Sequence, residues 1–77
     1  MTYDELIRRL RPLGVEFRRQ ASGSHEIWWR PATGRRTVIP HHSHRDIKPQ
    51  TLASILRDLG LNARDLTEST GGQGGDS

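Results

Sequence analysis

The last apolar side chain of the chain is Leu66, so any hydrophobic core has to be built from the first 66 residues. Residues 67–77 contain four glycines and otherwise only polar or charged residues. A segment of this composition cannot bury enough apolar surface to offset the entropy lost on ordering, and we expect a disordered tail there. Residues 1–66 then form one small domain, too short for a second domain or a deep cofactor pocket.

The predicted domain is clearly basic. The whole chain has 12 basic and 9 acidic side chains, and leaving out the tail removes Glu68 and Asp76, so seven acidic groups face twelve basic ones and the charge is +5. Arginine forks pair with phosphate at two points, which favours a polyanionic partner. Nucleic acid is favoured over a membrane surface, because no basic amphipathic helix with an aromatic face is visible. A charged surface that serves only solubility is the alternative.

The sequence shows neither cysteine chemistry nor a targeting or membrane-spanning segment. The chain has no cysteine, which excludes disulfides, thiolate metal sites and a cysteine nucleophile, and suits a reducing compartment. Its first ten residues, MTYDELIRRL, contain acids and arginines where a signal peptide has an apolar run. No stretch approaches membrane-spanning length. We therefore expect a cytoplasmic protein.

Two helices are predicted, one at each end of the domain. Thr2 and Glu5 have the spacing of a capping box, and the helix that they start runs to about Arg11. Pro49 is a suitable first residue for the second helix, and Gly60 a suitable stop. The apolar stripes are Leu6, Ile7 and Leu10 in the first helix, and Leu52, Ile55, Leu56 and Leu59 in the second.

Between the helices, three short strands are predicted over residues 15–20, 24–30 and 35–40, separated by turn residues. In the second strand, alternation places His25, Ile27 and Trp29 on one face and the two residues between them on the other. Both helical stripes need a sheet face to pack on. The fold class is therefore α+β: a two-layer α-β-β-β-α sandwich, whose three-stranded antiparallel sheet carries two helices on one face. Asn62 is expected to cap a last short turn, with Leu66 folding back.

Basic residues gather in the strands and in the loop before the second helix, which predicts a phosphate surface. Arg35 and Arg36 are adjacent on one strand, so only one of them can serve a single groove. Three histidines, His41, His42 and His44, lie in the sequence PHHSH, either as phosphate donors or as packing residues of a turn. No carboxylate or cysteine pair lies at a recognised ligand spacing, and we predict no metal and no cofactor.

His25 follows Gly23 and Ser24 in a tight turn, at the edge of the sheet. Its parity with Ile27 also allows a packing role in the core, and the residues alone leave the two roles open. No catalytic carboxylate pair, serine-histidine arrangement or phosphate-binding glycine loop is present. RNA, however, carries its own nucleophile in the 2′-hydroxyl, so one histidine and a few cations are sufficient to cleave it.

In combination, several segments of the chain resemble the HicA toxins. The match extends from Asp4 to Leu66 and rests on a set of motifs in one order and spacing. These are Gly23-Ser24-His25, Val38-Ile39-Pro40-His41-His42, Lys48, Thr51-Leu52 and Ile55-Leu56-Arg57. The resemblance implies a double-stranded-RNA-binding-like fold and a ribosome-independent endoribonuclease that cuts mRNA and arrests translation. It also implies that a HicB-type antitoxin covers the His25 surface, with operator DNA contacted only through the antitoxin.

The resulting prediction is a metal-independent mRNA interferase, with residues 1–66 as the RNA-cleaving domain and residues 67–77 as its glycine-rich tail. His25 is the predicted catalytic acid/base, supported by Gly23 and Ser24. The predicted RNA contacts are Arg35, Arg36, His41, His42 and Lys48.

Two positions depart from the family pattern. Family members often have glycine just before the threonine of the second helix, where this chain has Gln50. Glu26 stands where many members of the family have histidine or lysine, and the effect of its charge on the neighbouring His25 is open. Two other functions remain as alternatives: a non-catalytic RNA-binding domain of the same fold, and an interaction module anchored by an exposed Trp28 or Trp29.

Overall fold

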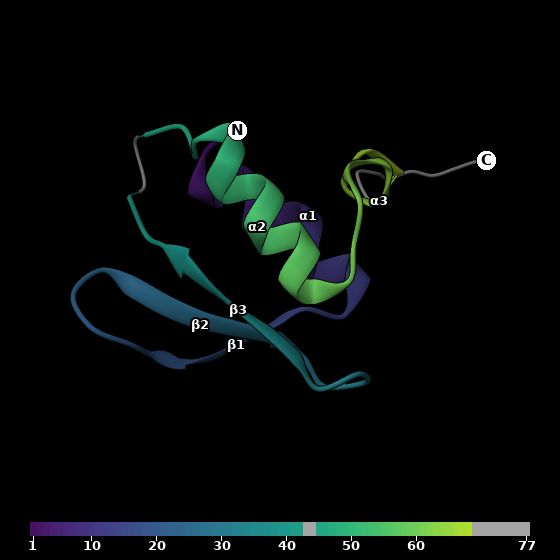
Figure 1. Cartoon of the computed structure of the whole chain (residues 1–77), viewed down its shortest axis with the longest axis horizontal. Coiled ribbons are helices and arrows are strands. Elements are labelled where there is room, and N and C mark those ends of the chain that lie inside the picture. The colour runs from purple at the N-terminus through teal and green to yellow at the C-terminus, as the bar shows by residue number, and fades with distance from the viewer. Residues whose placement is uncertain (43–44, 69–77) are drawn as a thin grey trace.

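The structure of the protein is a computed structural model and describes residues 1–42 and 45–68. Its elements along the chain are α1 (Tyr3–Leu10), a 3-10 turn η1 (Arg11–Leu13), β1 (Glu16–Gln20), β2 (His25–Arg30), β3 (Arg35–Pro40), α2 (Pro49–Leu59) and α3 (Ala63–Glu68) (Figure 1). The predicted α-β-β-β-α order is confirmed, and the expected last turn is a short third helix. Among the described helices, none has the length and apolar character that crossing a membrane requires.

The three strands form an antiparallel meander in the order β1-β2-β3. Strand β2 pairs with β3 without a break, from His25 opposite Pro40 to Arg30 opposite Arg35. The pairing of β1 with β2 is interrupted by a bulge between Phe17 and Arg19. An extra residue in one strand increases the local twist and redirects the side chains beside it.

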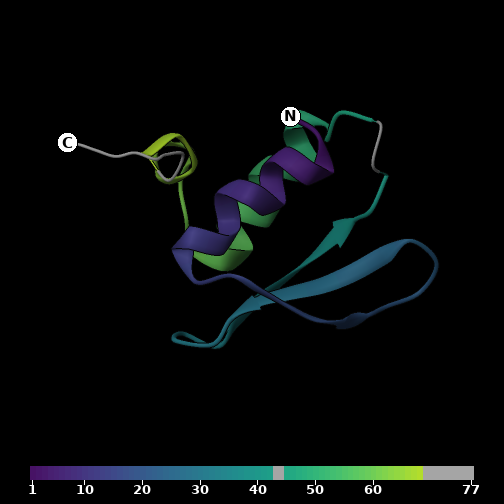
Figure 2. The same cartoon turned by 180° about the vertical axis from the view of Figure 1, so that it is seen from behind.

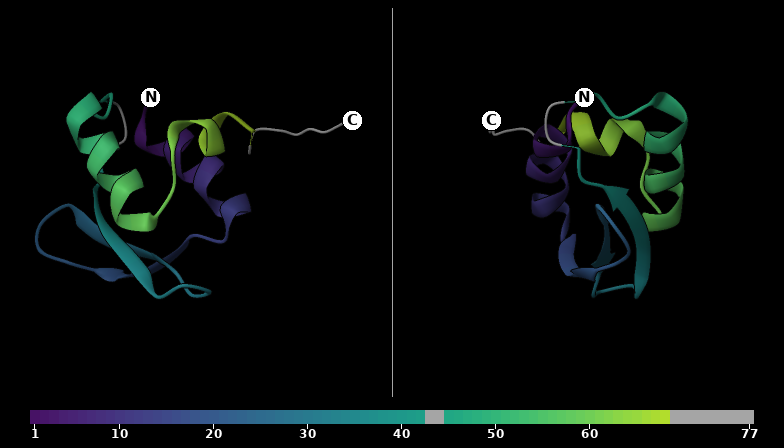
Figure 3. Two further views of the ribbon diagram at one scale, coloured as in Figure 1. Left: turned by 45° about the vertical axis from the view of Figure 1, so that its right-hand side comes forward. Right: turned by 90° about the vertical axis from the view of Figure 1, so that its left-hand side faces the viewer.

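Helices α1 and α2 lie side by side on one face of the sheet, and the other face has no helix on it (Figures 2 and 3). In the core, Val15, Trp28 from β2 and Ile39 from β3 pack with the apolar stripes of the helices. The predicted stripes are confirmed: Leu6, Ile7, Leu10, Ile55, Leu56 and Leu59 are buried, and Leu52 is partly buried against them.

The predicted cap of α1 forms only in part. The Thr2 hydroxyl accepts a hydrogen bond from the backbone N–H of Glu5 at 3.3 Å. The Glu5 carboxylate does not return that bond but accepts from Arg9 Nη2 at 3.1 Å, one helical turn away. The first helix is therefore started by the threonine, while the glutamate stabilises its exposed side.

The expected turn at Asn62 forms as a reciprocal cap of α3. Asn62 Oδ1 accepts from the backbone N–H of Asp65 at 3.0 Å, and Asp65 Oδ2 accepts from the backbone N–H of Asn62 at 2.9 Å. This cap turns the chain so that Leu66 is buried in the core. Helix α3 includes residues 67 and 68 of the predicted tail, and residues 69–77 lie outside the described part of the chain.

The buried face of β2 is the one that carries Glu26 and Trp28, whereas His25 is exposed. Of the two roles left open for His25, packing in the core is thus wrong. Both faces carry one tryptophan, so alternation alone did not distinguish them. Glu26 can be buried because Tyr3 of α1 and His41, just after β3, supply hydrogen-bond partners for its carboxylate.

Candidate functional site

The tight turn between β1 and β2 positions His25 at one end of the sheet. Gly23 has φ +60°, a left-handed conformation that favours glycine, while an added Cβ would meet no atom within 4 Å. The glycine is therefore needed for backbone conformation and not for close approach. The turn is held by backbone bonds from His25 N to Ser22 O at 3.0 Å and from Ala21 N to His25 O at 2.9 Å.

Two further contacts fix the backbone at this position. Gln20 Nε2 donates to the carbonyl oxygens of Gly23 at 3.1 Å and His25 at 2.9 Å. The backbone N–H of His41 donates to Ser24 O at 2.9 Å, which ties the end of β3 to the start of β2. Ser24 thus acts through its carbonyl group, and the backbone of His25 is fixed from both neighbouring strands.

The His25 imidazole is exposed and makes no hydrogen bond or ion pair with the described residues. Neither ring nitrogen is therefore directed by a neighbouring side chain in that part of the chain. A substrate atom can reach either nitrogen, so the group is available for proton transfer.

Glu26 is the centre of a buried polar cluster on the other side of β2. Its Oε1 accepts from Tyr3 Oη at 2.5 Å and from Trp28 Nε1 at 2.9 Å, and its Oε2 lies 3.0 Å from His41 Nδ1. The rings of Tyr3 and His41 stack with centroids 3.8 Å apart. Although Glu26 follows His25 in sequence, its carboxylate contacts the imidazole of His41.

The cluster keeps its carboxylate ionised. Burial raises the pKa of Glu26, but hydrogen bonds from Tyr3, Trp28 and His41 outweigh it, and the pKa lies below its ordinary value. Burial and the bond to Glu26 also raise the pKa of the Tyr3 hydroxyl, which remains a donor. Because an ionised carboxylate only accepts, Nδ1 of His41 carries the proton and Nε2 is the nitrogen left for other partners.

His42 and Lys48, both exposed, meet in a cavity of about 300 Å³ at the beginning of α2. Its lining is Pro40, His42, Arg45, Asp46, Ile47, Lys48 and Thr51. Pro40 is also the strand partner of His25, so the cavity and the His25 imidazole flank the same end of β3. This groups His25, His42 and Lys48 at one end of the sheet.

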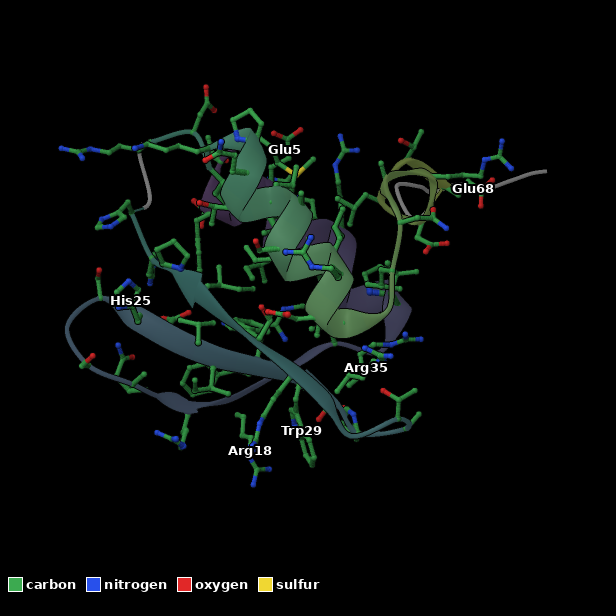
Figure 4. The ribbon with its side chains drawn as sticks, in the orientation of Figure 1. Glu5, Arg18, His25, Trp29, Arg35 and Glu68 are labelled. Carbon is green, nitrogen blue, oxygen red and sulfur yellow. The ribbon has the colours of Figure 1, made fainter. Side chains whose placement is uncertain are left out.

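The two predicted arginine contacts lie at the opposite end of the sheet, where Arg35 pairs with Arg30 and Arg36 with Trp29; Figure 4 shows Arg35 there. Arg35 reaches the helix layer, where its Nη1 donates to Asp58 O at 3.3 Å. There it compensates the negative end of α2, together with Arg30, whose Nη1 donates to Leu59 O at 3.0 Å. Arg36 is exposed and forms no ion pair with a described carboxylate. The two arginines thus have different surroundings, and a contact of either with RNA stays a prediction.

A cation–π pair that the sequence did not indicate lies at the bulge. The guanidinium carbon of Arg18 is 4.4 Å from the centre of the Trp29 ring, and both side chains point away from the helices (Figure 4). Their contact depends on the β1–β2 register, which residue spacing does not specify. Trp28, by contrast, is 2% exposed and cannot anchor a partner. Within residues 1–42 and 45–68, no three potential ligands come together to hold a metal ion. His44 lies outside the described residues.

Comparison with known proteins gives one match. The family model described as the HicA toxin of bacterial toxin-antitoxin systems matches residues 3–61. The chain belongs to the HicA toxin family. The three-stranded antiparallel sheet with its helices is compatible with the double-stranded-RNA-binding-like fold expected for a HicA protein. As the toxin half of a pair, a HicA protein implies an antitoxin partner. No match was found among curated proteins or solved structures.

Proposed function

We propose that this HicA-family protein is a ribosome-independent endoribonuclease that cuts mRNA and arrests translation, with His25 as its catalytic acid/base. The observation that supports this most directly is the exposed imidazole of His25, held by its backbone at the end of the sheet. Basic side chains lie around that end: His42, Arg45 and Lys48 line the neighbouring cavity. They are suited to bind the phosphates on either side of a cleavage point.

The proposed reaction uses the RNA as its own nucleophile. A base removes the proton of a 2′-hydroxyl, the oxygen attacks the adjacent phosphorus, and the bond to the 5′-oxygen of the next nucleotide breaks. The leaving oxygen takes up a proton, so the products are a 2′,3′-cyclic phosphate and a 5′-hydroxyl. His25 can perform either proton transfer, and the cations stabilise the charge that develops on phosphate. No step requires a metal ion or a cofactor.

The proposed protein partner is a HicB-type antitoxin that covers the His25 surface, and operator DNA would be contacted through that antitoxin alone. Covering the exposed imidazole would be enough to block both proton transfers. Trp29, half-buried on the same side of β2, offers an aromatic contact for such a partner.

A non-catalytic RNA-binding domain is the second candidate, and one observation favours it. In the described residues, no side chain orients the His25 ring, whereas catalytic histidines are commonly directed by a carboxylate or carbonyl group. Such a protein would use the same cations to bind phosphates and leave the strand intact.

The deciding experiment compares the wild-type protein with His25→Ala and His25→Gln, induced at equal levels, by growth and RNA integrity. We expect arrest and RNA decay with the wild type only, and cyclic-phosphate ends on the fragments. Circular dichroism of purified protein controls for folding, which the exposed position of His25 should leave intact. Equal RNA decay with all three would contradict a role for His25, and RNA binding without decay would support the second candidate.

A further inference from the structure

The sheet face that the helices leave uncovered has an unusual composition, and we call it the open sheet face. By register and alternation its residues are Glu16, Arg19, Ile27, Trp29, Arg36 and Val38, and Arg18, the extra residue of the bulge, joins them through its contact with Trp29. Figure 4 shows Arg18 and Trp29 pointing away from α1 and α2. The helices cover only the opposite face, as both views of Figure 3 show. An apolar and aromatic surface therefore remains accessible.

The apolar part of the open sheet face is continuous across two strands. Ile27 lies opposite Val38 in the β2–β3 pairing, and Val38 is 47% exposed. Trp29 comes two residues after Ile27 on the same side of β2 and is partly buried. Exposed apolar patches that polar groups surround commonly mark a binding site.

The charges around this apolar strip are mostly positive. Arg18, Arg19 and Arg36 are exposed, and none of them forms an ion pair with a carboxylate in the described part of the chain. The acidic residue in this row is Glu16, opposite Trp29 in the β1–β2 pairing. Three guanidinium groups against one carboxylate favour a polyanion over a neutral or basic protein surface.

The contact between Arg18 and Trp29 adds a preference for unpaired bases. The guanidinium carbon lies over the indole ring, 4.4 Å from its centre, so a planar cation and an aromatic ring adjoin on the open sheet face. Bases stack on both aromatic rings and arginine planes when they are unpaired. In a duplex the bases already stack on each other, and only the backbone and groove edges are available.

We propose that the open sheet face binds the unpaired bases of single-stranded RNA, with Arg18 and Trp29 as the stacking platform and Arg19 and Arg36 as phosphate contacts. This inference deepens the proposed function, on which it rests, by naming the form of RNA and its path. His25 lies on the same side of β2, four residues or about 13 Å before Trp29. RNA that lies along β2 would reach His25 at the strand's first residue.

The test measures binding by the full chain carrying His25→Ala, so that RNA is not cut. The probes are fluorescein-labelled 12-nucleotide oligoadenylate and the same strand annealed to oligouridylate. We expect the single strand to bind more tightly than the duplex and to quench tryptophan fluorescence. Adding Trp29→Leu should weaken single-strand binding on the order of tenfold and abolish quenching, because one stacked base contributes about that much. Trp29→Phe should recover part of the affinity.

Two further variants separate charge from stacking and control for folding. Adding Arg36→Gln should reduce the slope of log affinity against log salt by roughly 0.7, the effect of one phosphate contact on a single strand. Arg64→Ala removes a positive charge from an exposed position of α3 and should leave the affinity unchanged. Circular dichroism confirms that each variant is folded.

Two outcomes would overturn the inference. One is tighter binding of the duplex than of the single strand. The other is an RNA affinity that the Trp29 and Arg36 variants leave unchanged. If these variants kept their RNA affinity but lost binding to a protein partner, the open sheet face would be a protein-binding surface and the inference would be wrong. The proposed function is tested separately: it is wrong if the protein with His25 intact binds RNA but does not cut it. Binding through the open sheet face would then still stand.

Discussion

Replacing Glu26 by glutamine tests the polar cluster that joins α1, β2 and β3. The variant keeps the shape of the side chain but removes its charge. The amide oxygen can still accept from Tyr3 and Trp28, while the amide nitrogen faces His41 Nδ1 and can donate to it once the imidazole proton is on Nε2. Hydrogen bonds to charged groups contribute about 1.5–3 kcal/mol and neutral ones about 0.5–1.5 kcal/mol. Three bonds that each weaken by about 1 kcal/mol, less the relief of desolvation, give a loss of about 2 kcal/mol at pH 7.

The loss should depend on pH, with a sign that the structure determines. The folded pKa of Glu26 is lowered from the ordinary value of 4.5, so the unfolded chain binds the proton more readily. The carboxylate therefore stabilises the fold fully above the unfolded pKa, and this stabilisation is lost as the pH falls through the folded pKa. The gap between wild type and Glu26→Gln should be constant above about pH 6 and shrink in the acid range.

Urea unfolding followed by circular dichroism, from pH 3 to pH 7, measures this gap. At pH 7 the midpoint of thermal unfolding should fall by roughly 10 °C, because 1 kcal/mol corresponds to about 4–8 °C in a domain of this size. Glu16→Gln is the matched control, since it removes the charge of an exposed glutamate without an ion pair in the described residues, and should change stability by less than about 0.5 kcal/mol. A Glu26→Gln protein as stable as the wild type, or an equal gap at pH 3 and pH 7, would refute the reasoning: desolvation would then balance the three bonds.

Three further substitutions test the elements around the site. Gly23→Ala should destabilise by about 1 kcal/mol, because an L-residue at φ +60° is strained, and Gly23→Asn by less; equal unfolding midpoints for both would contradict this explanation. Thr2→Ala should cost about 1 kcal/mol through loss of the α1 cap, and Thr2→Ser should keep most of that stability in a urea titration. Leu6→Ala removes a fully buried side chain and should cost about 2–5 kcal/mol; a loss below 1 kcal/mol in calorimetry would show that the core collapses into the space.

The architecture was predictable from the sequence because its signals are local. Periodicity of apolar residues, the capping threonine and the turn sequences each specify a helix, a strand or a turn within a few residues. Together they predicted the order of elements and the one-sided packing that the structure has. The turn before His25 was also predictable from neighbouring residues, since Gly23 adopts the left-handed conformation that glycine favours.

The candidate site was predictable only in part, because its contacts join residues that are far apart in sequence. The predicted RNA contacts separate into two groups, with Arg35 and Arg36 at one end of the sheet, and His42 and Lys48 at the other. His41 lies near the second group, but one of its nitrogens is taken up by Glu26. Adjacent residues of a strand face opposite sides, so sequence neighbours are poor guides to a shared site.

The sequence by itself determined the elements, their order, the basic charge and the family of this protein, since each of these is written in local patterns and motifs. Only the tertiary structure decided which face of β2 is buried. Trp28 and Trp29 are equivalent by alternation, and Glu26 on the buried side would be an unfavourable charge without its donors. Tyr3 of α1 and His41 after β3 supply them from 23 and 15 residues away. With Glu26 on the buried face of β2, Trp28 is buried too, and Trp29 and His25 lie on the accessible face. The sequence could not determine this face, because the free energy of a buried carboxylate depends on partners that only the fold brings together.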